Sequence, residues 1–244
     1  MEEKLLLVKY QDQLADNLSI YANAQITADK HNLKCCYENI SDARNHFEQQ
    51  MDCFNLKCRY ISQNRASEIN EKIPLNKNKI NKNYYINDKC FDLNNMFNIS
   101  NELISQFQFK NTNFIFNHDL LESIITDNSI GLYIHEHSYI DENFIQDATK
   151  RLNKYLKQPI LYIFTKNNYI SKLNLDIKYK IIDIDNPKEE FYMLYSCNHK
   201  IIYTDTNSHS QGFWASFLNQ KDYCYVIYSK KIKLKNKKHN WIAI

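Results

Sequence analysis

Short apolar runs alternate with amphipathic helical patterns twice along the chain, and this alternation restricts the fold more than any other feature. In the first series, an apolar run at 4–10 precedes a helical pattern at 14–33. A second apolar run at 33–39 then precedes a helix with Ser41 as its N-cap. The side chains that share one side of the first helix are Leu14, Leu18, Tyr21, Ala22 and Ile26. Strands and helices in this order predict a parallel sheet with right-handed crossovers.

The second series begins near residue 130. Its strands are expected at 130–136, 159–166, 178–184, 201–206 and 224–230, and its helices at 141–158, 186–200 and 211–220. The helix at 141–158 places Phe144, Ala148, Leu152 and Leu156 on one face. Between the two series, the polar residues 62–90 are expected to form a loop or small subdomain, followed by helices at 100–109 and 117–127.

The double alternation predicts an α/β protein of two Rossmann-like lobes with parallel sheets, residues 1–128 and 129–244. Ligands of such lobes bind outside the carboxyl ends of the parallel strands. We therefore expect the two sheets to face a central cleft that holds the ligands.

Composition excludes several classes of function. The chain of 244 residues has only 2 glycines, so neither a Gly-x-Gly-x-x-Gly turn nor a P-loop can be formed. Its net charge is +3, from 31 basic and 28 acidic residues, which does not indicate a nucleic-acid partner. Its 7 cysteines include no Cys-x-x-Cys pair, which is typical of reduced thiols in a cytoplasmic protein. Neither a signal peptide nor an apolar run long enough to span a membrane is present.

Polar side chains gather where the first strand of the second series ends, in the stretch GLYIHEHSYI at 131–140. The carboxyl end of a parallel strand is where ligands bind, so a ligand site is one interpretation and a polar loop is the other. A His-Glu-His sequence on a strand directs at most two imidazole nitrogens to one side. No metal site is therefore predicted.

The order of these segments resembles the bacterial α-1,2-fucosyltransferase family (glycosyltransferase family 11-like), which has a two-lobed fold of the GT-B type. The stretch VKYQDQLADNLSIYANA (8–24) corresponds to the family's strand, Gly-Gly-Leu-Gly-Asn-Gln turn and Tyr-Ala helix, and YIHEHSY (133–139) to its His-x-Arg-Arg-Gly-Asp-Tyr. EEFYMLYSCNHKIIYTDT (189–206) resembles its Asp-Leu-Tyr-Leu-Met-Ser-x-Cys-x-His-x-Ile-Ile-Ala-Asn-Ser-Ser. GFWASFLN (212–219) and NWIAI (240–244) resemble its Trp-rich helix and its final Trp-Ile-x-Ile, so we expect the chain to end where the family ends.

The departures from the family pattern affect the charged groups. A nucleotide-sugar donor leaves as a nucleoside diphosphate, and the family supplies positive charge from its Arg-rich loop without a metal. That loop has no arginine here, and His135 and His137 stand in its place. Imidazole is charged only near and below its usual pKa of about 6.5. The glycines of the first turn are replaced by Asp12, Gln13 and Ala15.

The resemblance implies a nucleotide-sugar donor, GDP-fucose, in the second lobe, and a glycan or lipid-linked glycan acceptor on the side of the first lobe. Candidate donor-binding residues are His135, His137, Ser138, Tyr139, Thr204, Thr206 and Trp214, and those of the N-terminal loop are Gln11, Asp12, Gln13 and Asn17. Candidate catalytic carboxylates are Asp16, Glu136 and Asp205. The simpler alternatives are that Asp16 and Asp205 cap their helices and that Trp214 packs in a core.

The resemblance predicts an inverting, metal-independent glycosyltransferase that needs no cofactor, as in surface polysaccharide or lipopolysaccharide synthesis. The alternative is an inactive relative that binds glycans or acts as a scaffold subunit, because the donor-binding motifs are altered. The segment KKIKLKNKKH (230–239) is either a solvated edge strand and tail, whose lysines prevent edge pairing, or a weak dock onto anionic lipid. A cytoplasmic location, with possible contact to the inner face of the membrane, is expected.

Overall fold

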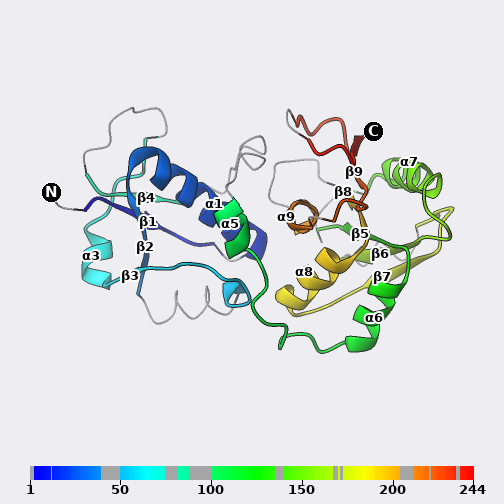
Figure 1. The fold of residues 1–244 in the computed structure, drawn as a ribbon, viewed down its shortest axis with the longest axis horizontal. Helices are drawn as coiled ribbons and strands as arrows, with labels where there is room; N and C mark the ends of the chain where they lie inside the picture. The colour runs from blue at the N-terminus through cyan, green and yellow to red at the C-terminus, as the bar shows by residue number, and fades with distance from the viewer. Residues whose placement is uncertain are drawn as a thin grey trace. The chain divides into compact units, whose positions relative to one another are not determined.

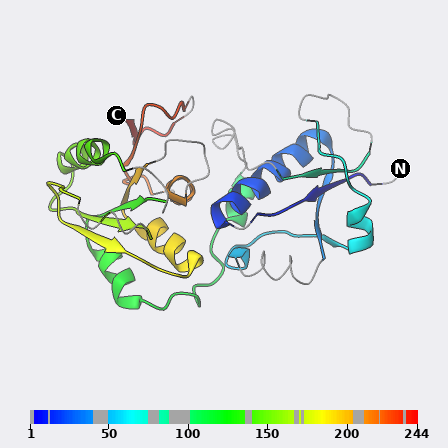
Figure 2. The same ribbon diagram turned by 180° about the vertical axis from the view of Figure 1, so that it is seen from behind.

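The computed structural model describes residues 3–11, 13–39, 50–74, 82–87, 101–135, 140–166, 170, 173–203, 211–219, 221–234 and 237–244. The chain divides into two units, residues 1–111 and 112–244. Both are drawn in Figure 1 and, from behind, in Figure 2. The helix expected from Ser41 falls mostly outside the described residues.

The first unit contains a parallel sheet in the order β3-β2-β1-β4 (Figure 1). Its strands are β1 (Leu5–Val8), β2 (Lys34–Glu38), β3 (Tyr60–Ile61) and β4 (Tyr84–Ile86), and its helices are α1 (Leu14–His31), α3 (Gln63–Ser67) and α5 (Asn101–Gln106). All four residues of β1 are buried, as expected for an apolar run in the middle of a parallel sheet covered on both faces. The prediction of strand, helix and strand over 4–39 is confirmed.

The polar region 62–90 contributes more structure than its composition predicts. It includes α3 and β4, and β4 pairs with β1 in register from Leu6 with Tyr84 to Val8 with Ile86. The sequence pattern missed β4 because its three residues are too few to show a period. Pairing with the buried strand β1, far away in the sequence, stabilises a strand that its own residues specify weakly.

The second unit contains a six-stranded parallel sheet in the order β10-β9-β8-β5-β6-β7. Its strands are β5 (Ser129–Tyr133), β6 (Ile160–Phe164), β7 (Tyr179–Ile182), β8 (His199–Ile202), β9 (Val226–Tyr228) and β10 (Trp241–Ala243). Its helices are α6 (His118–Thr126), α7 (Glu142–Asn153), α8 (Pro187–Ser196) and α9 (Gln211–Leu218). Numbered along this unit, the strand order is that of the Rossmann fold.

Alternate side chains of β5 form the two sides of this core. Ile130, Leu132 and Ile134 pack with the apolar face of α7. Gly131 faces the opposite side, where a Cβ atom would lie 2.9 Å from Leu194 Cδ1 and 3.0 Å from Cys197 Sγ. Glycine is needed here because α8 lies directly against the strand.

The C-terminal strand was not expected. The run at 224–230 was predicted to be the last strand, but β10 follows it and pairs with β9. Trp241 of β10 is buried and packs edge-on against Phe213 of α9. A three-residue run can form a strand here because its indole is enclosed by another element of the same unit.

The two units separate before α6 rather than near residue 128. Glu189 explains the position of the boundary, because its carboxylate accepts hydrogen bonds of 2.8 Å from the backbone N–H groups of Phe116 and Asn117. The Phe114 ring also packs edge-on against Tyr192 of α8. Residues 112–128 therefore belong to the second unit by their contacts.

Two Rossmann-like units with parallel sheets follow one another along the chain, which is the α/β architecture predicted from the sequence. Among the described helices, none is both long and apolar enough to cross a membrane.

Candidate functional site

The reversal of strand order in the second sheet lies between β5 and β8, which are paired and parallel. The crevice outside the carboxyl ends of two such strands is the usual ligand site of a doubly wound sheet. His135 follows β5 and Tyr203 follows β8 at this edge. Both segments that the sequence selected, 135–139 and 204–206, therefore begin at neighbouring strand ends. Glu136, His137, Ser138, Tyr139, Thr204, Asp205 and Thr206 lie outside the described residues.

Contacts of Tyr203 join the end of β8 to the start of α7, the helix that follows the polar stretch. The Tyr203 hydroxyl accepts a hydrogen bond of 2.9 Å from the backbone N–H of Asp141, which is the N-cap of α7. The Asp141 carboxylate in turn accepts a hydrogen bond from the Phe144 N–H, and the rings of Phe144 and Tyr203 lie 5.7 Å apart. The start of α7, on the C-terminal side of the polar stretch, is thus fixed to the end of β8.

Glu190 is a buried carboxyl group at the same edge of the sheet and was not among the residues predicted from the sequence. It lies in the first turn of α8, which follows the carboxyl end of β7, and its exposed fraction is 6%. Burial raises the pKa of Glu190 to about 7, with a smaller contribution from Asp183, while Lys166 and a hydrogen bond with Gln211 oppose the rise. A carboxyl group that titrates near neutral pH at a strand edge is typical of a functional site.

The groups around Glu190 come from separate elements. Lys166 follows β6, Asp183 follows β7, and Gln211 is the first residue of α9. Lys166 forms an ion pair of 2.9 Å with Asp185, and both side chains are exposed, so this pair adds little to stability. A sequence signal for Glu190 did exist, because it occupies the acidic position that opens the resembled motif at 189–206.

The first turn of α9 carries no acidic side chain. The free N–H groups and the dipole of a helix N-terminus favour negative charge. Because α9 follows β8, its N-terminus belongs to the carboxyl edge of the sheet. The edge therefore combines an anion-favouring helix end with the Glu190 carboxyl.

Trp214 was expected at the donor site, and the structure corrects this expectation. Its indole has no exposed surface and packs edge-on against Phe217. The physical reason is that α9 is buried over almost its whole length, so its aromatic residues fill the core. The simpler alternative, helix packing, is the one observed.

In the first unit, the side chain of Asn17 closes the turn between β1 and α1. Its Oδ1 accepts a hydrogen bond of 2.9 Å from the Gln11 N–H, and its Nδ2 donates to the Gln11 carbonyl and to Gln50 Oε1. Both amide hydrogens are therefore used within the unit. Asn17 positions this loop, and its amide has no hydrogen left to donate to a ligand.

The other predicted residues of this turn lie nearby. Gln13 is the N-cap of α1 without a side-chain capping bond, and Asp16 is buried within the first turn. Asp16 is therefore not the N-cap, the role it was given as an alternative. Asp12 lies outside the described residues. Tyr10, which follows β1, stacks on Tyr37 with ring centroids 5.4 Å apart.

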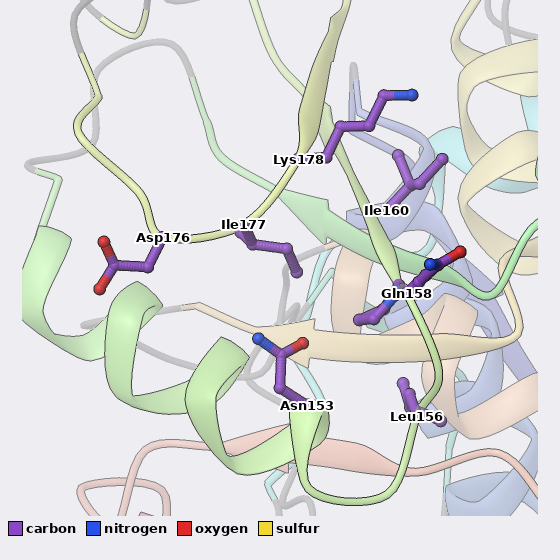
Figure 3. Close-up of a pocket in the computed structure, with 8 residues that line it drawn as sticks. Asn153, Leu156, Gln158, Ile160, Asp176, Ile177 and Lys178 are labelled. Carbon is purple, nitrogen blue, oxygen red and sulfur yellow. The ribbon is translucent and has the colours of Figure 1, made fainter.

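A pocket of about 540 Å³ lies at the opposite edge of the second sheet (Figure 3). Its walls come from the end of α7, the start of β6 and the segment before β7, and they include Asn153, Gln158, Ile160, Asp176 and Lys178. This is the amino-terminal edge of the strands, away from Glu190 and His135. Among the described residues, no three His, Cys, Asp or Glu side chains are placed to hold a metal ion.

Three solved structures that are similar to this chain are fucosyltransferases. The fucosyltransferase NodZ from Bradyrhizobium matches with a TM-score of 0.52 over 88% of this chain and 92% of that chain, at 14% identity. NodZ α-1,6-fucosyltransferase soaked with GDP-fucose matches with a TM-score of 0.53 over 89% and 93%, at 13% identity. A variant of Arabidopsis thaliana FUT1 in complex with GDP matches with a TM-score of 0.54 over 93% and 70%, at 9% identity.

At these identities the likeness shows the fold, which is that of GT-B-like fucosyltransferases. No protein-family model and no curated protein sequence matches the chain. The predicted fold type is thus confirmed, while the assignment to the α-1,2 family and the roles of the site residues other than Trp214 stay predictions.

Proposed function

We propose that this protein is a glycosyltransferase that moves a sugar from a nucleotide-sugar donor to a hydroxyl group of a glycan. The observation that carries this proposal is the likeness of nearly the whole chain, through both units, to fucosyltransferases. Two of these structures are described with GDP or GDP-fucose. GDP-fucose is accordingly the donor that we propose, with surface polysaccharide or lipid-linked glycan as the acceptor class.

The second unit is proposed to bind the donor and the first unit the acceptor. The support for the donor side is the carboxyl edge at β5 and β8, where His135, the N-terminus of α9 and Glu190 belong to one sheet edge. His137, Ser138, Tyr139, Thr204 and Thr206 follow the same strand ends in the sequence. Positive charge from the helix end and the histidines would replace the arginines that this loop lacks.

Glu190 is proposed to recognise the base of the donor nucleotide. A carboxylate accepts two parallel hydrogen bonds, and guanine offers such a pair of donors through its N1–H and its 2-amino group. Uracil offers a single ring N–H. This chemistry favours GDP over UDP, which agrees with the donor proposed from the fold.

The reaction is proposed to be a single inverting displacement without a metal. The acceptor oxygen attacks the anomeric carbon, the bond from that carbon to the diphosphate oxygen breaks, and the nucleoside diphosphate leaves with the bonding electrons. The acceptor hydroxyl proton passes to a carboxylate, for which Asp16, Glu136 and Asp205 are the candidates. Activity that persists in excess EDTA is the expected result, and loss of activity that Mg²⁺ or Mn²⁺ restores would contradict this part.

The test is calorimetric titration of GDP, UDP and GDP-fucose from pH 5.5 to 8.5 on the wild type, on His135→Ala/His137→Ala and on Glu190→Gln. An imidazole attracts a phosphate by charge only when it is protonated, so donor binding that depends on imidazole weakens as pH rises. Binding by Glu190 strengthens as pH rises through about 7, because the carboxylate form accepts the base. The variant His135→Ala/His137→Ala should therefore bind GDP more tightly at high pH than at low pH. The variant Glu190→Gln should lose the preference for GDP over UDP.

The alternative function is an inactive relative that binds glycans or serves as a scaffold subunit. The absence of arginine from the loop at 133–139 favours it. Binding of no nucleotide at any pH in this range would support the alternative and refute the transferase. Binding of GDP-fucose with slow release of free fucose, even without an acceptor, would support the transferase.

A further inference from the structure

The segment between β9 and β10, residues 229–239, carries a strong local charge. It contains six lysines and no acidic residue, whereas the whole chain has a net charge of +3. The remainder of the chain is therefore net acidic, because removing these six lysines changes the net charge from +3 to −3. We call residues 229–239 the lysine segment; it lies near the C-terminus in Figure 1.

The structure removes one explanation of these lysines. Lysine commonly protects the edge strand of a sheet from pairing with other chains. The last strand of this sheet is β10, Trp241–Ala243, which contains no lysine. The lysine segment precedes β10 and is not an edge strand in its described residues.

Four of the six lysines of this segment are described as exposed to solvent. Lys230, Lys231, Lys233 and Lys237 are exposed, and within the described part of the chain none of them forms an ion pair. The segment is anchored at both ends, by a hydrogen bond from the Lys230 N–H to the Ile244 carbonyl and by one from the Trp241 N–H to the Lys238 carbonyl. Lys230 and Lys238 are thus both held by backbone bonds to the C-terminal residues of the second unit, while 235 and 236 lie outside the described residues.

Lys221 and Tyr223, which precede β9, extend this surface, and the electrostatic interaction between Lys238 and Asp222 connects them to the lysine segment. Lys238 is half-buried, close enough to Asp222 for that carboxylate to act on its charge. Next to Asp222, Tyr223 is 59% exposed, and Lys221 lies over its ring at 5.7 Å from the centroid. An exposed tyrosine beside lysines is suited to a membrane–water interface, where amphipathic rings are enriched.

We propose that the lysine segment, with Lys221 and Tyr223, binds the surface of an anionic lipid bilayer. All the cations are lysines, which act as point charges and suit the diffuse charge of a bilayer, whereas arginine is the side chain that grips single phosphates with two bonds. Ile232 and Leu234 alternate with the lysines and are half-buried, the segment contains no Phe, Tyr or Trp, and Tyr223 alone is too little to stack successive bases as single-strand binders do. A nucleic acid is therefore the less suitable partner.

The test is co-sedimentation of the whole protein with phosphatidylcholine vesicles, with and without 30% phosphatidylglycerol, at about 0.1 M salt. We expect binding to the anionic vesicles alone, and its loss at about 0.5 M salt, where charges are screened within a few ångströms. The variant Lys230→Gln/Lys231→Gln/Lys233→Gln should bind about a hundredfold more weakly, because each lysine near an anionic surface contributes about a fivefold factor.

The control variant carries the same change of charge on another surface of the same unit. Lys150→Gln/Lys154→Gln/Lys157→Gln replaces three exposed lysines at the end of α7 and should bind vesicles like the wild type. Equal losses in the two variants, equal binding to neutral vesicles, or tighter binding of a single-stranded oligonucleotide than of vesicles would overturn the proposal. Circular dichroism of both variants confirms that they fold, and none of these readouts depends on transferase activity.

Discussion

At the scale of single residues, the adjacent Glu189 and Glu190 of α8 have different structural roles. The Glu189 carboxylate accepts two backbone N–H groups and anchors residues 116–117 to the second unit. Glu190 is buried beside Lys166 and Gln211 and has a raised pKa. Two neighbouring residues of one helix point in different directions, so their sequence adjacency does not imply a shared role.

The raised pKa of Glu190 predicts how stability depends on pH. The folded state keeps the Glu190 proton up to about pH 7, whereas the unfolded state loses it near pH 4.5. The free energy of unfolding therefore falls as pH rises from 4.5 to 7. Glu190→Gln removes this loss and should be more stable than the wild type by about 1–3 kcal/mol above pH 7, measured by denaturant unfolding. Glu122→Gln, an exposed change on α6, should show no such gain; a matching gain there would contradict the assignment to Glu190.

His199 predicts the opposite dependence. It is buried at the start of β8, where its Nδ1 accepts a hydrogen bond of 3.1 Å from the Tyr225 N–H, and burial lowers the pKa of His199 to about 4. The unfolded state binds this proton near pH 6.5, so stability falls as pH decreases from 6.5 to 4. His199→Asn keeps a hydrogen-bond acceptor near the position of Nδ1. It should reduce the loss of unfolding free energy between pH 6.5 and 4 by about 1–3 kcal/mol. The exposed His118→Asn serves as the control, and an unchanged acid profile in His199→Asn would refute the prediction.

At the scale of elements, the contact of β5 with α8 depends on the absence of one side chain. A Cβ atom at Gly131 would lie within 3.0 Å of side-chain atoms of Leu194 and Cys197. Gly131→Ala should therefore lower the free energy of unfolding by about 1–3 kcal/mol, measured by thermal or denaturant unfolding. Adding Leu194→Val removes the closest obstruction, so the double variant should lose less than the sum of the two single changes. If the double variant lost the full sum of the two single losses in unfolding free energy, Gly131 and Leu194 would not be closely packed.

At the scale of the whole molecule, the second unit offers two sites at opposite edges of one sheet. The proposed donor site lies at the carboxyl ends of β5 and β8, and the pocket of Figure 3 lies at the amino-terminal edge. Hydrogen exchange distinguishes them. GDP should slow exchange in peptides that contain the carboxyl ends of β5 and β8, by burying their amides, and leave peptides at 153–160 and 174–178 unchanged. Slower exchange in the pocket peptides alone would place the nucleotide at the amino-terminal edge and contradict the proposed donor site.

The amino-acid pattern was sufficient for the fold class because it depends on local periods. Apolar runs such as 130–134 and amphipathic stretches such as 141–153 specify strands and helices through their own residues, and their alternation leaves few arrangements other than parallel sheets. The pattern also identified the strand ends after β5 and β8, because ligand sites of such sheets depend on topology.

Other features depend on residues that are distant in the sequence, and only folding brings these together. Strands β4 and β10 exist through their partners β1 and β9. The burial of Trp214 follows from the packing of α9, and the use of the Asn17 amide follows from Gln50, 33 residues away. The raised pKa of Glu190 follows from its burial, and charges and a hydrogen bond from residues far away in the sequence, Lys166, Asp183 and Gln211, modify that pKa. No local period contains these contacts, because burial and charge around a side chain are set by the tertiary packing.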